Sequence, residues 1–246
     1  MTGLLDRLLR LATGPRPTLT AGAGGALPDA VVYRGPATLP GCPEAVARAL
    51  RSAGLRTAYI GPDECLPLTA ESLSGVRLYA QPGGGELDDA WRHLRRSASV
   101  VRDHVEGGGA YLGFCLGAYL AGDDPGFDLL PGKVDQYVVS LGATIDHTDD
   151  ALVSLDWGGS TRTMYFQDGA YVRLADGADA EVVARYDNGA VAALVCDRGR
   201  GRVGVVGPHP EAERDWYTDA GLPVPRPLAT DLAVDLVQRV CAPTTG

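Results

Sequence analysis

Hydrophobic and polar positions repeat in two different ways along the chain, and the change falls near residue 134. Before it, short apolar runs alternate with longer stretches that have helical spacing. The expected elements are strands at 30–33, 57–60, 76–80 and 110–114 and helices at 43–53, 86–94 and 97–106. Pro43 and Gly54 fit the start and the end of the first helix. This alternation predicts an α/β fold with a parallel, doubly wound sheet, whose sites lie at the carboxyl ends of the strands.

After residue 134 the pattern changes to short strand-like runs separated by turn signals such as Gly158-Gly159 and Asn188-Gly189. The expected strands are 137–141, 151–157, 163–166, 171–174, 182–186, 191–195 and 202–206. These runs predict antiparallel additions on one edge of a mostly parallel sheet. The last two form a hairpin that leads into His209-Pro210-Glu211, and a helix at about 228–240 follows.

The first 28 residues differ from the rest. Leucines at positions 4, 5, 8, 9 and 11 have helical spacing, interrupted by Asp6, Arg7 and Arg10. A signal peptide would have a cleaner apolar segment and a small-residue cleavage site. Residues 14–28 are rich in Gly, Pro, Thr and Ala and are typical of a linker. We therefore expect an appended helix and linker at 1–28 and one domain at 29–246.

Composition narrows the class of protein. The chain has 246 residues, 45% hydrophobic and 22% charged, and no apolar run approaches the roughly 20 residues that span a bilayer. A net charge of -9 with a single lysine, Lys133, argues against a nucleic-acid surface. Five irregularly spaced cysteines predict neither a disulfide framework nor a zinc site. We expect a cytoplasmic protein without metal or cofactor.

The segment 110–119 combines an apolar strand, a cysteine at a turn and the start of a helix. Gly113 and Gly117 stand two residues before and after Cys115, the pattern of a nucleophile elbow. The free N–H groups at the start of the helix, beginning at Leu116, would stabilise a thiolate. The alternative is a buried cysteine in a core strand.

A cysteine nucleophile needs a base, a group that orients the base, and donors for the developing oxyanion. His209 follows a buried-looking strand, and Glu211 can turn back toward its imidazole. The other histidines, 93, 104 and 147, have polar neighbours and are expected to be exposed. Oxyanion donors are expected at the N–H of Leu116 and at Gly83 or Gly84. The alternatives are a plain turn at 209–211 and an ordinary loop at 83–85.

Five segments, in order, resemble class I glutamine amidotransferases (a flavodoxin-like fold) and, more closely, the amidotransferase-like N-terminal domain of biotin-protein ligases. They are Val32-Tyr33-Arg34-Gly35-Pro36, Gln81-Pro82-Gly83-Gly84-Gly85, the segment 108–119, Phe166-Gln167-Asp168-Gly169 and the segment 204–211. The resemblance covers roughly residues 29–215. It implies Cys115 as nucleophile, His209 as base and Glu211 as its orienter. Tyr119 stands where glutaminases usually have a glutamine that helps hold the substrate, which favours a flatter or more apolar ligand.

The expected function is a cysteine-dependent amidase or amidotransferase that acts on a carboxamide or related acyl group of a small molecule. A partner synthase or self-association is possible for such a protein. The alternative is a catalytically quiet domain that binds a small molecule or regulates another protein. A redox-sensing or chaperone module with an elbow cysteine is less favoured, because such modules place a glutamate near the thiol and residues 34–40 contain none.

Overall fold

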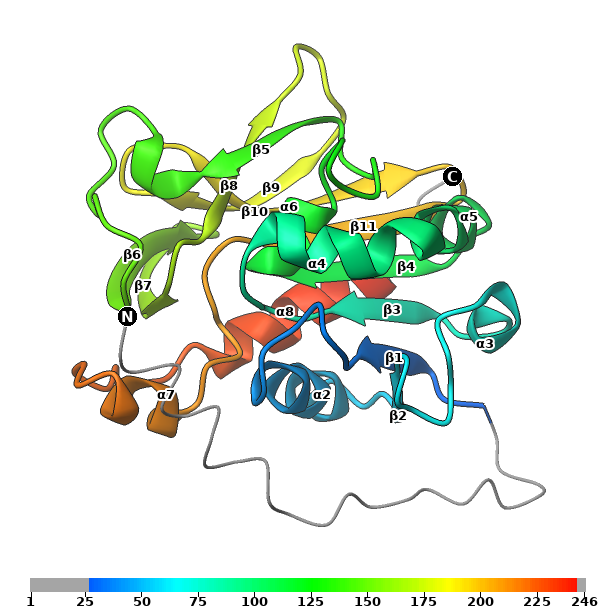
Figure 1. Cartoon of the computed structure of the whole chain (residues 1–246). Coiled ribbons are helices and arrows are strands. Elements are labelled where there is room, and N and C mark those ends of the chain that lie inside the picture. Colours follow the sequence, from blue (N-terminus) through cyan, green and yellow to red (C-terminus); the bar gives the residue numbers. More distant parts are fainter. Residues whose placement is uncertain (1–26, 243–246) are drawn as a thin grey trace.

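The computed structural model describes residues 27–242. Residues 1–26, which hold the expected N-terminal helix and most of the linker, lie outside the described residues. The first half of the described chain contains β1 (Ala30–Tyr33), α2 (Cys42–Ser52), β2 (Thr57–Ile60), α3 (Ala70–Leu73), β3 (Leu78–Gln81), α4 (Leu87–Leu94), a 3-10 turn (Arg95–Ser97), α5 (Ala98–Glu106), β4 (Ala110–Phe114) and α6 (Leu116–Leu120). Figure 1 shows this half in blue to green, with its helices around the strands.

The second half is mainly β structure. It contains β5 (Gly132–Gln136), a 3-10 turn (Tyr137–Val139), β6 (Ala151–Trp157), β7 (Ser160–Phe166), β8 (Ala170–Leu174), β9 (Glu181–Tyr186), β10 (Val191–Arg198), β11 (Gly201–Val206), α7 (Arg214–Asp219) and α8 (Thr230–Cys241). Within residues 27–242, the eleven strands form one sheet.

The parallel part of the sheet has the order β2-β1-β3-β4-β11. A chain that crosses over in this order is typical of flavodoxin-like sheets, where ligands bind beyond the carboxyl ends of the strands. β11 lies parallel to β4 on one side and antiparallel to β10 on the other. It is therefore the boundary between the two halves. The doubly wound α/β fold with antiparallel additions is confirmed, as a mixed sheet whose core strands are parallel.

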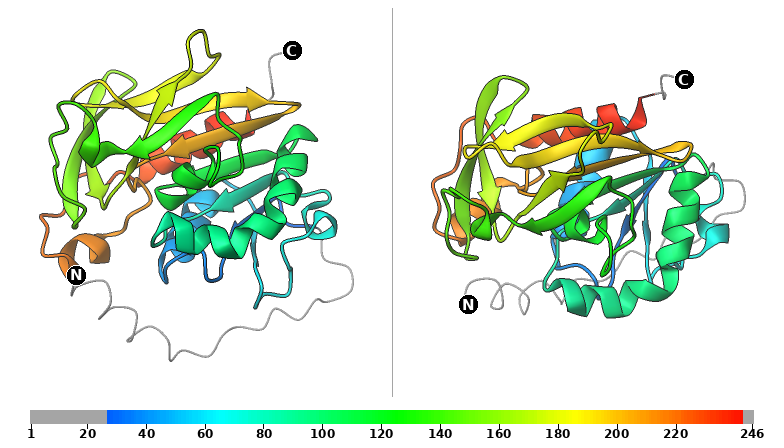
Figure 2. Two further views of the ribbon diagram at one scale, coloured as in Figure 1. Left: turned by 45° about the horizontal axis from the view of Figure 1, so that its top comes forward. Right: turned by 90° about the horizontal axis from the view of Figure 1, so that it is seen from above.

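Alternate side chains of the parallel strands point to opposite faces, and helices cover both. Val32 and Leu112 belong to the apolar cluster that includes α2 and α8. Tyr79 and Tyr111 belong to the cluster on the other face, with α4, α5 and α6. Burying each such side chain contributes on the order of 2 kcal/mol. Because both faces are buried, these strands are continuous apolar runs. Figure 2 shows α2 and α8 on the side of the sheet opposite α4 and α5.

The antiparallel half continues from β11 through β10, β9, β6 and β7, while β5 pairs with β8 and β8 pairs with β10. In Figure 1 this half lies at the top and left of the molecule. The two strands β7 and β8 are joined by a three-residue turn, Gln167, Asp168 and Gly169. We call these three residues the covering turn.

One expected strand is wrong. Residues 137–141 do not form a strand; β5 precedes them at 132–136, and Tyr137–Val139 is a 3-10 turn. The apolar residues of this stretch do not alternate between a buried and an exposed face, as they would in a strand. Tyr137 stacks on Tyr186 with ring centroids 3.8 Å apart, whereas Leu141 is 99% exposed. β5 contains a single large apolar residue, Val134, so its hydrophobic pattern is too weak to indicate a strand.

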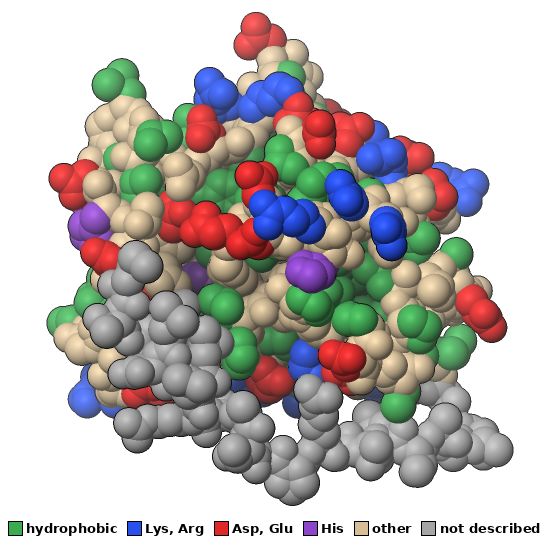
Figure 3. All heavy atoms as spheres, viewed as in Figure 1, with side chains coloured by type: hydrophobic (Ala, Val, Ile, Leu, Met, Phe, Trp, Pro, Cys, Tyr) green, Lys and Arg blue, Asp and Glu red, His purple; other side chains and the backbone are tan. Residues whose placement is uncertain are grey.

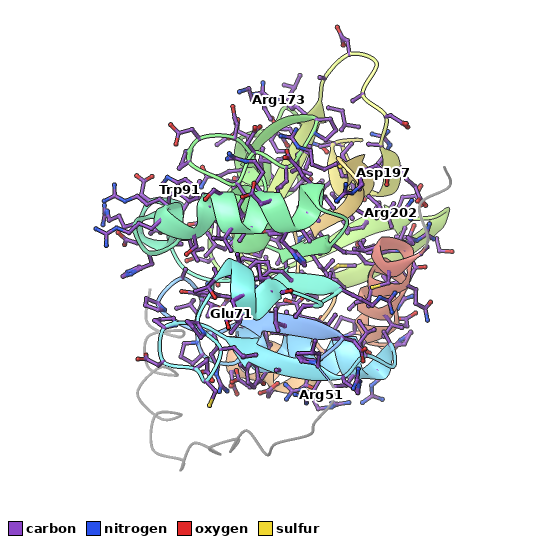
Figure 4. The ribbon with its side chains drawn as sticks, turned by 90° about the vertical axis from the view of Figure 1, so that its right-hand side faces the viewer. Arg51, Glu71, Trp91, Arg173, Asp197 and Arg202 are labelled. Atoms are coloured by element: carbon purple, nitrogen blue, oxygen red, sulfur yellow. The ribbon has the colours of Figure 1, made fainter. Side chains whose placement is uncertain are left out.

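The surface carries mixed charge. On the face drawn in Figure 3, basic and acidic side chains lie next to each other. Ion pairs such as Arg198 with Glu106 (3.3 Å) and Arg202 with Asp197 (3.0 Å) fit this picture, and Figure 4 shows Asp197 and Arg202 close together on the β10–β11 hairpin. None of the helices between residues 27 and 242 has the length and apolar character that crossing a bilayer requires.

Candidate active site

Cys115 stands between β4 and α6 in a backbone conformation that side chains rarely adopt. Its φ is 49° and its ψ is -107°. A non-glycine residue at such a position costs of order 1 to 3 kcal/mol and persists only when its surroundings hold it there. The N–H of Cys115 donates to the carbonyl of Val206 (2.9 Å), and its carbonyl accepts from Ala118 (2.8 Å). The elbow is therefore fixed on both sides by backbone hydrogen bonds.

The two glycines of the elbow are required by crowding. A Cβ on Gly113 would lie 2.3 Å from the Gly117 carbonyl oxygen, and one on Gly117 would lie 2.2 Å from the Gln81 carbonyl oxygen. Strand β4, helix α6 and strand β3 thus approach too closely for any larger residue. The structure confirms the crowding that the sequence pattern predicts, and Cys115 is 6% exposed.

His209 and Glu211 form a buried pair just beyond β11. His209 Nδ1 lies 2.9 Å from Glu211 Oε1, and their side chains are 5% and 0% exposed. The N–H of His209 donates to the carbonyl of Tyr165 (2.9 Å), which fixes the residue against the end of β7. Because Nδ1 is engaged with Glu211, Nε2 is the ring nitrogen left for Cys115.

Cys115 and His209 interact directly. Burial alone lowers the pKa of His209, but the negative charges of Cys115 and Glu211, both of which hydrogen-bond to the ring, outweigh burial and raise that pKa to about 10. The cause is electrostatic, because opposite charges in a buried site attract strongly. The three residues expected to work together, Cys115, His209 and Glu211, are thus brought into one chain of contacts. The second carboxylate oxygen of Glu211 is buried without a hydrogen-bond partner.

The glycine loop after β3 lies against the same residues. A Cβ on Gly83 would lie 2.7 Å from Cε1 of His209, and one on Gly84 would lie 2.3 Å from Cδ2 of Leu116. Only glycine fits at either position without movement of a neighbour. The structure places this loop against His209 and Leu116, and its part in a site stays a prediction.

Hydrogen bonds fix the orientation of the peptide between Gly83 and Gly84. The Gly83 carbonyl accepts from the Thr38 hydroxyl (2.6 Å) and from the Leu39 N–H (3.4 Å). In a trans peptide the following N–H points the opposite way, so the N–H of Gly84 points away from the loop at 38–39. Gln81, which is fully buried, supports the same loop by donating to the Ala37 carbonyl (3.0 Å).

Tyr119 lies on α6, one turn after the cysteine, and its hydroxyl donates to the carbonyl of Asp168 (3.0 Å). Burial, followed by the charges of Asp168 and Cys115, raises the pKa of Tyr119 far above its usual range. The hydroxyl thus remains a neutral donor. The contact places Tyr119 between the elbow and the covering turn.

The covering turn itself contacts the cysteine. The Cys115 thiol donates to the carbonyl of Gln167 across 3.6 Å. The Asp168 carboxylate accepts from the side-chain amide of Gln136 at 2.9 and 3.1 Å. Gln136 lies in no sequence pattern that indicates a site. Gln167 lies in one of the five segments that resemble the amidotransferases, and the Asp-Gly pair at 168–169 is a turn signal, but neither pattern indicates a contact with Cys115. Sequence reasoning therefore finds the turn but misses what it covers.

The other histidines lie elsewhere. His93 and His147 are exposed, as expected. The expectation for His104 is wrong: it is half-buried against Gly109, where a Cβ would lie 2.3 Å from its ring, and burial lowers its pKa. His104 follows the buried Val101 by three residues on α5, so it lies on the same side of the helix. Among residues 27–242, no group of three His, Cys, Asp or Glu side chains is arranged to hold a metal ion.

Comparison with known proteins identifies the family. A family model described as biotin-protein ligase, N terminal, matches residues 29–139. Imidazole glycerol phosphate synthase subunit HisH of Gloeobacter violaceus is 30% identical over 187 residues, which cover 68% of this chain and 77% of that protein. A crystal structure of a glutamine amidotransferase has a TM-score of 0.56 at 22% identity, covering 79% of this chain and 100% of that one. The chain belongs to the class I glutamine amidotransferase-like superfamily.

The sequence relatives and the solved structure match different shares of the chain. HisH of a Cyanothece species is 33% identical over 85 residues, which cover 31% of this chain and 40% of that protein. The chain spans only 40 to 50% of the length of the first curated relatives that it matches. The likeness to the solved amidotransferase extends over most of the chain and shows the fold.

Proposed function

We propose that the protein is a cysteine-dependent amidase or amidotransferase that transfers an acyl group from a carboxamide through Cys115. The observation that carries the proposal is the strained elbow cysteine in direct interaction with a buried His209–Glu211 pair. A packed core gains nothing from a positive φ at a cysteine or from a buried charged pair, each of which costs stability. A catalytic role explains both the positive φ of Cys115 and the buried His209–Glu211 pair.

The proposed reaction begins from the ion pair in which the Cys115 thiol proton has already passed to Nε2 of His209. The thiolate attacks the carbonyl carbon, and Nε2 returns the proton to the nitrogen as the carbon–nitrogen bond breaks, leaving a thioester and ammonia or an amine. Glu211 holds the other face of the imidazole and stabilises its protonated form. Water or another acceptor, deprotonated by His209, then cleaves the thioester.

Two N–H groups are proposed to bind the oxyanion. Leu116 is the first residue of α6, where an N–H has no partner within the helix. The N–H of Gly84 points away from the loop at 38–39, and Gly84 lies against Leu116. A donor removed from an oxyanion hole typically costs about 3 to 4 kcal/mol in the barrier. We therefore assign Leu116 and Gly84 as donors and Gly83 as the residue that keeps the loop close to His209.

The substrate is proposed to differ from free glutamine. A primary carboxamide with an amino-acid head group needs several polar partners, and an unmatched buried polar group costs about 1 to 3 kcal/mol. The hydroxyl of Tyr119 already donates to the Asp168 carbonyl, so it is engaged within the protein. The curated relatives are named as synthase subunits, which supports a partner synthase; self-association is the other arrangement we consider.

The second candidate is a catalytically quiet domain that binds a small molecule or regulates a partner. The burial of Cys115, at 6% exposed, and its contact with the Gln167 carbonyl favour this reading. The two candidates differ in one respect that can be measured: only the enzyme forms an acyl-thioester.

The test uses hydroxylamine, which captures a thioester as a hydroxamate. The full chain is incubated with a panel of primary carboxamides, glutamine and aromatic or aliphatic amides among them, and hydroxamate and intact protein mass are measured. We expect a Cys115 acyl adduct with at least one apolar carboxamide and little turnover of glutamine. Cys115→Ser should abolish the signal, and Cys65→Ser, which changes an exposed cysteine, should keep it. Absence of hydroxamate across the panel, with and without a synthase partner, would favour the quiet domain.

A further inference from the structure

The thiol of Cys115 has two competing partners on different parts of the molecule. His209, at the end of β11, can take its proton. The carbonyl of Gln167, in the covering turn, accepts the S–H across 3.6 Å. A carbonyl oxygen carries partial negative charge, so it accepts a hydrogen bond from a thiol and repels a thiolate. The two contacts therefore compete for the same sulfur.

Three further contacts hold the covering turn in place. The Tyr119 hydroxyl donates to the Asp168 carbonyl (3.0 Å), and the Gln136 amide donates to the Asp168 carboxylate (2.9 Å). The N–H of Tyr137 donates to the carbonyl of Gly169 (3.0 Å). Two of these three donors are side chains, so each can be removed by a substitution that leaves the backbone hydrogen bonds of the elbow in place.

The backbone of the covering turn is itself in a less favourable conformation. Asp168 has a φ of 46°, a left-handed conformation that aspartate tolerates better than most residues but at some cost. Gly169 cannot be enlarged, because a Cβ there would lie 2.9 Å from the carbonyl oxygen of Gly207. A turn that needs outside hydrogen bonds to keep such a conformation can change position when those bonds are lost.

We propose that the covering turn is a latch over Cys115, with Tyr119 and Gln136 as the positioning residues that keep it closed. In the closed state the Gln167 carbonyl limits access to the sulfur. A substrate acyl carbon that bonds to the sulfur must displace this carbonyl. The proposal deepens the proposed function, because an enzyme needs the latch to open, but the latch can be measured without any acyl donor.

The experiment measures alkylation of Cys115 in the full chain by limiting iodoacetamide, with peptide mapping, from pH 5 to 9. The variants are Tyr119→Phe, Gln136→Met and the double variant. Tyr171→Phe is the matched control, because Tyr171 lies on the neighbouring strand β8 and its hydroxyl has no hydrogen bond among residues 27–242. Cys196, buried on β10 with its pKa raised by burial to about 12, serves as an internal standard for general loosening.

We expect each single variant to raise the Cys115 rate about twofold to tenfold, the effect of one lost hydrogen bond, and the double variant to raise it further. The pH profile should move to lower pH, which a purely structural role would not cause. Tyr171→Phe should match the unmodified protein. Unchanged or slower labelling in the three variants, or an equal rise at Cys196, would overturn the latch. Asp168→Asn, which weakens the bond to Gln136, provides a second route if a variant is unstable.

The outcomes separate the latch from the proposed function. Faster labelling without hydroxamate from any carboxamide supports the latch and counts against the enzyme. Hydroxamate formation with unchanged labelling in the variants supports the enzyme and overturns the latch.

Discussion

The parallel and antiparallel halves of the sheet contribute to the candidate site in different ways. The parallel half supplies Cys115 and the glycine loop, and the backbone at Gly83, Gly84 and the elbow is crowded by its neighbours. The antiparallel half supplies the covering turn, which is held mainly by side-chain hydrogen bonds. His209 follows β11, the strand that belongs to both halves.

The two halves therefore have different roles: one fixes the position of the nucleophile, and the other controls what surrounds it. Backbone packing places Cys115, and such placement cannot change without disruption of the core. Side-chain hydrogen bonds place the covering turn, and each is worth only about 1 kcal/mol net. A site built in this way can keep its nucleophile rigid while its cover moves. Substitutions in the two halves test this division, beginning with the largest expected effect.

The first compares crowded glycines in the two halves. Gly113→Ala would bring a Cβ within 2.3 Å of the Gly117 carbonyl oxygen in a strand paired on both sides. Gly132→Ala would bring one equally close to the Arg173 carbonyl oxygen, but within residues 27–242 β5 pairs only with β8, so it can shift. We expect losses of about 4 kcal/mol or more and about 1 to 3 kcal/mol respectively in the free energy of unfolding.

Urea and thermal unfolding measure both losses, with melting temperature falling about 2 to 4 °C per kcal/mol. Gly85→Ala is the control, because a Cβ there meets nothing within 4 Å and should change stability by less than about 0.5 kcal/mol. Equal costs at Gly113 and Gly132 would show that the two halves are equally rigid.

The second prediction concerns the boundary strand. His209→Ala should slow Cys115 alkylation at neutral pH by about tenfold or more and move its pH profile upward, because the thiolate loses its imidazolium partner. Glu211→Gln should shift the profile in the same direction by less, since the imidazole remains. The measurement is alkylation rate against pH, with peptide mapping. Identical profiles for the three proteins would leave His209 without the role we propose.

The same histidine predicts a pH dependence of stability. The interactions with Cys115 and Glu211 raise the pKa of His209 from 6.5 to about 10, so the folded protein holds this proton more tightly than the unfolded chain. Its stabilisation is fully present below pH 6.5 and is lost as the pH rises toward 10. The difference in unfolding free energy between the unmodified protein and His209→Gln should therefore shrink across that range. A difference that grows with pH would contradict the assignment.

The sequence predicts the parallel half well and the antiparallel half less well. Continuous apolar runs and the Gly113, Cys115, Gly117 spacing indicate buried parallel strands and the elbow, because crowding permits few other residues there. Position 134 is the only large apolar residue of β5, and Tyr137 is buried by stacking on Tyr186, a contact that no local pattern reveals. The role of Gln136 depends on a contact 32 residues away in sequence, with Asp168.

The third and smallest effect compares two buried tyrosines, one in each half. Tyr111 donates to the Gly117 carbonyl (2.6 Å) in the elbow helix, and Tyr186 donates to the Ala170 carbonyl (2.7 Å), directly after the covering turn. Each replacement by Phe removes one buried hydrogen bond and should lower the unfolding free energy by about 1 to 2 kcal/mol. Stability alone therefore does not distinguish them.

Cys115 labelling should distinguish them, because the two bonds support different parts of the site. Tyr186→Phe removes a hydrogen bond to the first residue of β8, the strand that follows the covering turn. Alkylation of Cys115 should therefore rise about twofold, the effect of a weakened hydrogen bond. Tyr111→Phe leaves the covering turn untouched, and Gly117 keeps its bond from the Ala121 N–H (3.2 Å), so alkylation should not rise. If Tyr111→Phe accelerated labelling as much as Tyr186→Phe, access to the thiol would depend on the elbow as much as on its cover. The parallel half would then control reactivity as well as position.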